Sequence, residues 1–98
     1  MNVVLLPEAE NDLREATEWL GEHSEELPSR FKDAVSHTLA SIAEHPEMYP
    51  VIRKTVRRAL LSTFPYGVFY VNDGAQVVII AVVHHARNPG MWQRRADE

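Results

Sequence analysis

The order of apolar and polar positions predicts a strand and then a helix at the start of the chain. Residues 3–6 form a short apolar run that is typical of a strand and that stops at Pro7. Proline is well tolerated in the first turn of a helix, so Pro7 favours a helix from this point. Apolar side chains then recur every three or four residues on one helical face, at Ala9, Leu13, Ala16 and Leu20. We expect this helix to end near Gly21.

A second helix is predicted between residues 24 and 45. Its apolar side chains again share one face, at Phe31, Val35, Leu39 and Ile42. His45 precedes Pro46, and a residue before proline avoids the helical conformation, so the helix ends there. Only a few residues separate the two helices, which predicts an antiparallel helical hairpin.

After Pro50 the pattern changes to that of three successive strands. Residues 55–61 and 66–71 alternate between apolar and polar positions, and Asn72-Asp73-Gly74 is a good turn sequence for a hairpin. Residues 77–83 are seven apolar residues in a row. A strand of this kind must be covered on both faces, or one face must await a partner.

These elements predict a single α+β domain over residues 1–98. The order is β-α-α-β-β-β, and the N-terminal helical hairpin is expected to pack on one face of a small, largely antiparallel sheet.

Composition excludes several classes of site. The chain has no cysteine, which excludes disulfides, thiolate metal sites and cysteine nucleophiles. The apolar run at the start is too short for a signal peptide or a membrane span, so we expect a cytoplasmic protein without membrane contact.

Charge is distributed unevenly between the two halves of the chain. Residues 1–50 hold 11 acidic and 3 basic residues, a net of −8, and residues 51–98 hold 3 acidic and 7 basic residues, a net of +4. The basic half indicates either a site for an anionic partner or ion pairing with the acidic half. The acidic residues between Glu8 and Glu26 are interpreted as a solvated helical face.

His84 and His85 are the first candidates for chemistry, at the end of the last strand. An imidazole titrates near neutral pH, so either histidine could act as an acid or base, or it could simply cap the strand end. Successive strand residues point to opposite faces, and no other ligand stands at a metal-site spacing, so we expect no metal and no cofactor.

Arginine and lysine side chains are the candidates for anion contact. They gather on the first strand after Pro50 and just beyond the last strand, at Arg53, Lys54, Arg57, Arg58 and Arg87. Guanidinium groups bind phosphate and carboxylate through paired donors, although solvated surface charge is the alternative. Arg57 and Arg58 point to opposite faces, so at most one of them joins a given site. The aromatic residues between 64 and 70 are interpreted as core packing.

Four segments together resemble the ParE/RelE superfamily of toxins from type II toxin–antitoxin operons. They are PEAENDLREATEWL, HPEMYP, VRRALLSTFPYGVFYV and IIAVVHHARNPGMW, in this order along nearly the whole chain. The FPY sequence and the H-x-x-R-x-P-x-x-W ending are most similar to the ParE branch, also called plasmid stabilisation proteins.

The resemblance implies a toxin whose partner is a cognate antitoxin, with a dimer or hetero-oligomer as the assembly. ParE-like members act on DNA gyrase without a hydrolytic centre, whereas RelE-like members cut mRNA on the ribosome. In the RelE-like case the resemblance implies catalytic roles for Arg57, His84, His85 and Arg87. Trp92 stands where such nucleases have a tyrosine, and it has no acidic hydroxyl, which favours the ParE-like, non-enzymatic function.

A third hypothesis is a degenerate member that only binds its antitoxin. In each case we expect anion or partner contact from Arg53, Lys54, Arg58, Arg87 and Trp92. The Asn88-Pro89 turn and Trp92 are expected to fold the tail back onto the sheet.

Overall fold

The computed structural model describes residues 1–86 and 90–96 of the chain. Its elements follow the order β1 (Val3–Leu5), α1 (Pro7–His23), α2 (Leu27–Glu44), β2 (Val51–Arg53), β3 (Val56–Leu60), β4 (Tyr66–Asn72), β5 (Val77–His84) and α3 (Met91–Ala96). The predicted α+β class and its helical hairpin are therefore confirmed, and β2 and α3 are additional elements. α1 runs two residues beyond the expected end at Gly21.

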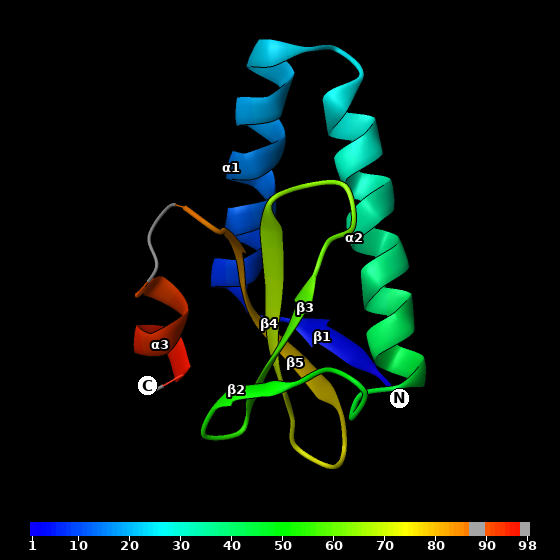
Figure 1. Cartoon of the computed structure of the whole chain (residues 1–98), viewed down its shortest axis with the longest axis vertical. Coiled ribbons are helices and arrows are strands. Elements are labelled where there is room, and N and C mark those ends of the chain that lie inside the picture. The colour runs from blue at the N-terminus through cyan, green and yellow to red at the C-terminus, as the bar shows by residue number, and fades with distance from the viewer. Residues whose placement is uncertain (87–89, 97–98) are drawn as a thin grey trace.

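The five strands form one mixed sheet in the order β1-β5-β4-β3-β2. β1 pairs with β5 in parallel, and the other three pairings are antiparallel. The expected turn joins β4 to β5: Gly74 has a φ of +90°, and Asn72 Oδ1 accepts from its amide at 2.9 Å. The sheet is thus largely antiparallel, with its first and last strands side by side (Figure 1).

The helical hairpin packs against one face of this sheet. Each helix has proline in its first turn, and α2 ends directly before His45-Pro46 as predicted. The apolar stripes of both helices join one core with alternate strand residues, among them Phe31, Ile42, Val68, Tyr70 and Ile79. Figure 1 shows α1 and α2 side by side, joined at one end by a short connection. No helix within the described ranges is long and apolar enough to cross a membrane.

The other face of β5 is covered by α3. Trp92 packs there in a second cluster of buried residues with Val56, Phe69, Ile80, Ala81 and Val83. The apolar run 77–83 is therefore covered on both faces by the chain itself. Six of its seven residues are buried and Val78 is half-buried, which favours the first of the two alternatives for that run.

A β-bulge at Ile80 changes which residues of β5 face each cluster. Phe69 pairs with Ala81 and Tyr70 pairs with Ile79, so Ile80 is the extra residue. As a result Ile80 and Ala81 both belong to the cluster under α3, whereas Ile79 and Val82 belong to the core under the helices. The bulge explains how an unbroken apolar run fills two cores without strict alternation.

Candidate functional site

Arg57 and Arg58 lie on β3, and their side chains are used in different places, as the sequence predicts. The Arg57 guanidinium donates to the carbonyl oxygens of Glu47 and Tyr49, at 3.1 and 2.6 Å. Arg57 thereby binds the loop between α2 and β2 and does not line the pocket that contains His84 and His85.

Tyr70 supports the same loop from β4. Its hydroxyl donates to the carbonyl oxygen of Pro46 at 2.7 Å, and its side chain is fully buried. Burial raises the pKa of Tyr70 from 10.0 to about 12, although the nearby positive charge of Arg57 opposes the shift and Tyr49 adds to it. The phenol is therefore a neutral hydrogen-bond donor at physiological pH.

Arg58 lies on the other face of β3, where several predicted residues meet around a pocket of about 180 Å³. The pocket draws its walls from three strands, the turn after β5 and α3, and it is lined by Arg58, Phe69, Val83, His84, His85 and Trp92. We call it the Arg58 pocket. Phe69 and Trp92 stack against each other there, with ring centroids 4.9 Å apart and an interplanar angle of 14°.

Both histidines reach this pocket although they are consecutive in sequence. His84 ends β5, and its ring packs edge-on against Tyr66 at 5.1 Å while its Nδ1 accepts from the amide of Ala86 at 3.0 Å. His85 already lies in the following turn and is exposed, so strand alternation does not separate the pair. The described residues contain no group of three or more side chains suited to hold a metal ion.

Arg53 and Lys54 lie at the turn between β2 and β3, apart from the Arg58 pocket. Both are exposed, and Lys54 has the left-handed backbone φ of 52° that this tight turn requires. Arg87, Asn88 and Pro89 fall outside the described residues.

Asp12 and Arg95 form a buried ion pair that sequence reasoning did not find. Arg95 Nη1 lies 2.6 Å from Asp12 Oδ2, and Arg95 Nη2 donates to Oδ1 at 3.0 Å. The pair also satisfies the backbone at the bulge, because Asp12 accepts from the amide of Val82 and Arg95 donates to the carbonyl of Ile80, both at 2.9 Å. The expectation of a solvated acidic face on α1 is therefore wrong at Asp12, which is only 8% exposed.

This ion pair fixes α3 in place and so completes the Arg58 pocket. It joins α1 to α3, and α3 carries the Trp92 wall of the pocket. Trp92 thus folds the tail onto the sheet as predicted.

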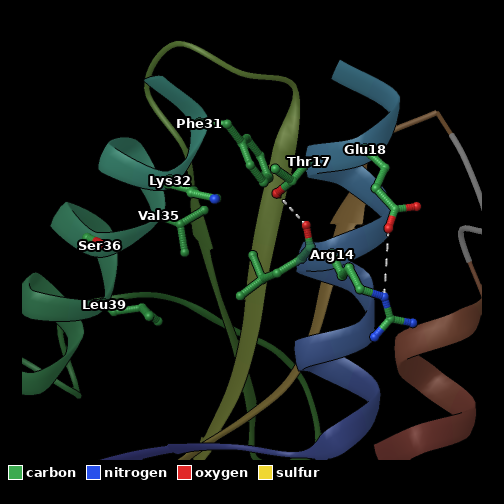
Figure 2. Close-up of a pocket in the computed structure, with 9 residues that line it drawn as sticks. Arg14, Thr17, Glu18, Phe31, Lys32, Val35, Ser36 and Leu39 are labelled. Atoms are coloured by element: carbon green, nitrogen blue, oxygen red, sulfur yellow. Dashed lines mark hydrogen bonds and ion pairs between the residues drawn. The ribbon is translucent and has the colours of Figure 1, made fainter. Parts of the chain in front are cut away.

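A second cavity is a groove of about 570 Å³ between the two long helices. Figure 2 shows side chains from α1 and α2 lining it, with the strands behind. Its floor is apolar, from Leu13, Phe31, Val35 and Leu39, and its rim carries Arg14, Thr17, Glu18, Lys32 and Ser36. Arg14 and Glu18 face each other on one wall at 3.9 Å. We call this the interhelical groove.

Comparison with known proteins identifies the family. The family model described as ParE toxin of type II toxin–antitoxin system, parDE, matches residues 3–89. The chain belongs to the ParE toxin family. Among solved structures, it is similar to a chain of the chromosomal ParDE TA system from P. aeruginosa, with a TM-score of 0.64 and 16% identity. That match covers 86% of this chain and 95% of the other and shows a shared fold. No curated protein matches the chain.

In this ParE-family toxin the predicted site residues divide into three groups. Arg58, His84, His85 and Trp92 meet around one pocket. Arg57 binds the loop after α2, and Arg53 and Lys54 lie at the turn between β2 and β3, outside the pocket lining. The pocket offers one guanidinium and two imidazoles beside an apolar wall, a set able to bind an anion or to move a proton. The interhelical groove offers an apolar surface for a protein partner.

Proposed function

We propose that this chain is the toxin of a type II toxin–antitoxin pair, that it arrests growth by acting on DNA gyrase, and that a cognate antitoxin neutralises it. Membership of the ParE toxin family carries this proposal. A non-enzymatic action is favoured by Arg57, one of the residues expected in a nuclease site, because it is bound to carbonyl oxygens of the loop after α2 and does not line the Arg58 pocket.

The interhelical groove supports an antitoxin as the partner. An apolar floor of this length on a helical hairpin fits an amphipathic segment, whose apolar side chains would enter between α1 and α2. Lys32 on the rim is exposed and would meet acidic side chains on such a segment. The chain itself would remain cytoplasmic, as its target requires.

Gyrase action is tested with purified components. The toxin is expected to inhibit supercoiling by gyrase and to increase double-strand breakage of plasmid DNA in its presence. Normal supercoiling at saturating toxin would refute the gyrase target.

Antitoxin docking is tested by co-expression with the protein encoded beside the toxin gene. Ser36 is an exposed residue of the groove, and Ser36→Arg would fill the groove without disturbing the buried core. This variant is expected to remain toxic and to escape rescue. The matched control is Ser29→Arg, also exposed on α2 but outside the groove, which should be rescued normally. Equal rescue of both variants would contradict docking at this groove.

The second candidate is a RelE-like, ribosome-dependent endoribonuclease. The convergence of Arg58, His84 and His85 on one pocket favours it, since phosphoryl transfer needs a general acid or base beside positive charge. Primer extension on mRNA after induction would reveal cleavage at defined positions. If cleavage is seen, Arg87→Ala is expected to slow it several-fold, and an unchanged rate would remove Arg87 from the site.

A growth assay distinguishes both candidate functions from the third hypothesis, a degenerate member that only binds its antitoxin. A chain that only binds its antitoxin would cause no growth arrest when expressed alone.

A further inference from the structure

We propose that the Arg58 pocket is a binding site for a phosphate group. The inference is independent of antitoxin docking in the interhelical groove, because it concerns a different cavity lined by different residues. It requires no gyrase action, and it concerns the same pocket that the endoribonuclease candidate would use.

The first argument is the charge of the pocket. Three of its six lining residues are basic, namely Arg58, His84 and His85, and none of the six is acidic. All six residues lie in the half of the chain from 51 to 98, whose net charge is +4 although the whole chain carries −4. Such a cavity concentrates anions.

The second argument is an unsatisfied donor. Within residues 1–86 and 90–96, the Nε of Arg58 is buried and finds no hydrogen-bond partner. Buried donors of this kind are rare, and they commonly mark a place where a water molecule or an ion completes the structure. An anion beside the Arg58 guanidinium would provide the acceptor that the described residues do not.

The third argument is that the backbone makes room for this arginine. Gly67 on β4 lies beneath its aliphatic stem, and a Cβ at residue 67 would come within 3.4 Å of both Cγ and Cδ of Arg58 and 3.2 Å of the Phe69 ring. The close fit keeps the arginine stem flat against the sheet. This contact restricts the rotamers of Arg58 and holds its guanidinium at the pocket.

Size and shape favour phosphate. A volume of about 180 Å³ is well below the roughly 300 Å³ of the smallest drug-sized sites. The pocket thus suits a single small group. Three basic side chains placed on different elements surround a tetrahedral anion better than a planar carboxylate, which one guanidinium alone satisfies through paired donors. The stacked Phe69 and Trp92 rings leave an apolar wall for whatever the phosphate is attached to.

Binding is tested on the full chain by calorimetry in phosphate-free buffer. The three probes are inorganic phosphate, a nucleoside 5′-monophosphate and a short single-stranded oligonucleotide. Much tighter binding of the oligonucleotide would identify the source as nucleic acid, and equal affinity for all three would identify free phosphate. Both outcomes would support a phosphate site in the Arg58 pocket. If none of the probes binds at millimolar concentration, the proposed phosphate site is refuted.

Two substitutions locate the site. Arg58→Gln is expected to weaken binding at least tenfold, whereas Arg30→Gln, which removes the same charge from an exposed position on α2, should leave it unchanged. His85→Gln is the second variant, because His85 is exposed and its loss should not impair folding; a several-fold weakening is expected. Equal binding by Arg58→Gln and Arg30→Gln would refute the proposal. The proposal would also be refuted if a glutamate-rich peptide bound through Arg58 and phosphate did not bind.

Discussion

Asp12 occupies the buried stripe of α1 between Ala9 and Ala16, where the neighbouring buried side chains are apolar. Its position on the stripe could be read from the sequence, since it follows Ala9 by three residues and precedes Ala16 by four. Its partner could not, because Arg95 is 83 residues away and lies on a helix that forms only by docking. The only sign of the ion pair in the sequence is an acidic residue on an apolar stripe, and the acidic neighbours of Asp12 on α1 favour the interpretation of a solvated face instead.

Removing the charge of Asp12 should therefore destabilise the fold. Asp12→Asn leaves Arg95 without its counter-charge, and breaking a buried pair in this way costs about 3 kcal/mol. Urea denaturation measures the loss in the free energy of unfolding. The matched control is Asp33→Asn on the exposed face of α2, where a change within about 0.5 kcal/mol is expected. A similar effect of both substitutions would contradict the role of the ion pair.

Tyr70 gives the fold a defined response to alkaline pH. Its pKa is about 12 in the folded state and 10.0 when exposed, so above pH 10 the unfolded chain loses this proton before the folded chain does. The stabilisation of the folded state that Tyr70 provides is fully present below pH 10 and is lost as the pH rises through about 12.

Tyr70→Phe should show a shallower loss of stability over that pH range. Its stability near neutral pH should be lower by about 1 kcal/mol, because the hydrogen bond to Pro46 is absent. Denaturation midpoints measured at a series of pH values compare the two proteins, and all other titrating groups are common to both. Parallel pH profiles would show that Tyr70 is not the group responsible.

At the scale of elements, the first strand, the two long helices and the last three strands were predictable, whereas β2 and α3 were not. Periodicity over many residues identifies α1 and α2, and a turn sequence identifies the β4–β5 hairpin. β2 has three residues and α3 has six, too few to show a period. α3 owes its place to Trp92 and Arg95, whose partners lie on other elements. The Arg58 pocket was predictable only in part, because Phe69 joins it through strand register.

α3 should behave as a structural cover of the second core. Trp92 is 9% exposed, and Trp92→Ala should lower the free energy of unfolding by about 3 kcal/mol because it vacates the site above Phe69 and Val83. Thermal or urea denaturation followed by circular dichroism measures this loss. Trp19→Ala is the control, since Trp19 is 39% exposed on α1 and a much smaller change is expected. If both substitutions lowered the free energy of unfolding equally, α3 would not be a structural cover of the second core.

At the scale of the whole molecule, the parallel pairing of β1 with β5 was the step that sequence alone left open. It brings the first and last strands together, and it places α1 close enough to α3 for their ion pair. The family resemblance was confirmed, whereas the burial of both faces of β5 depended on α3 and the bulge at Ile80.

Because both faces of β5 are covered, the isolated protein should be a monomer. Light scattering of the purified chain is expected to give a mass near 11.2 kDa that does not change with concentration. Trp92→Ala should instead self-associate, because it opens an apolar face. A concentration-dependent mass of the unaltered chain would contradict this expectation.

The bond between Asp12 and Arg95 also sets when the protein can finish folding. A ribosome makes the helical hairpin before β5, and β5 before Arg95, so the bulge is synthesised before its charged partner. The carbonyl of Ile80 at the bulge therefore gains its hydrogen bond from Arg95 only after α3 has been made.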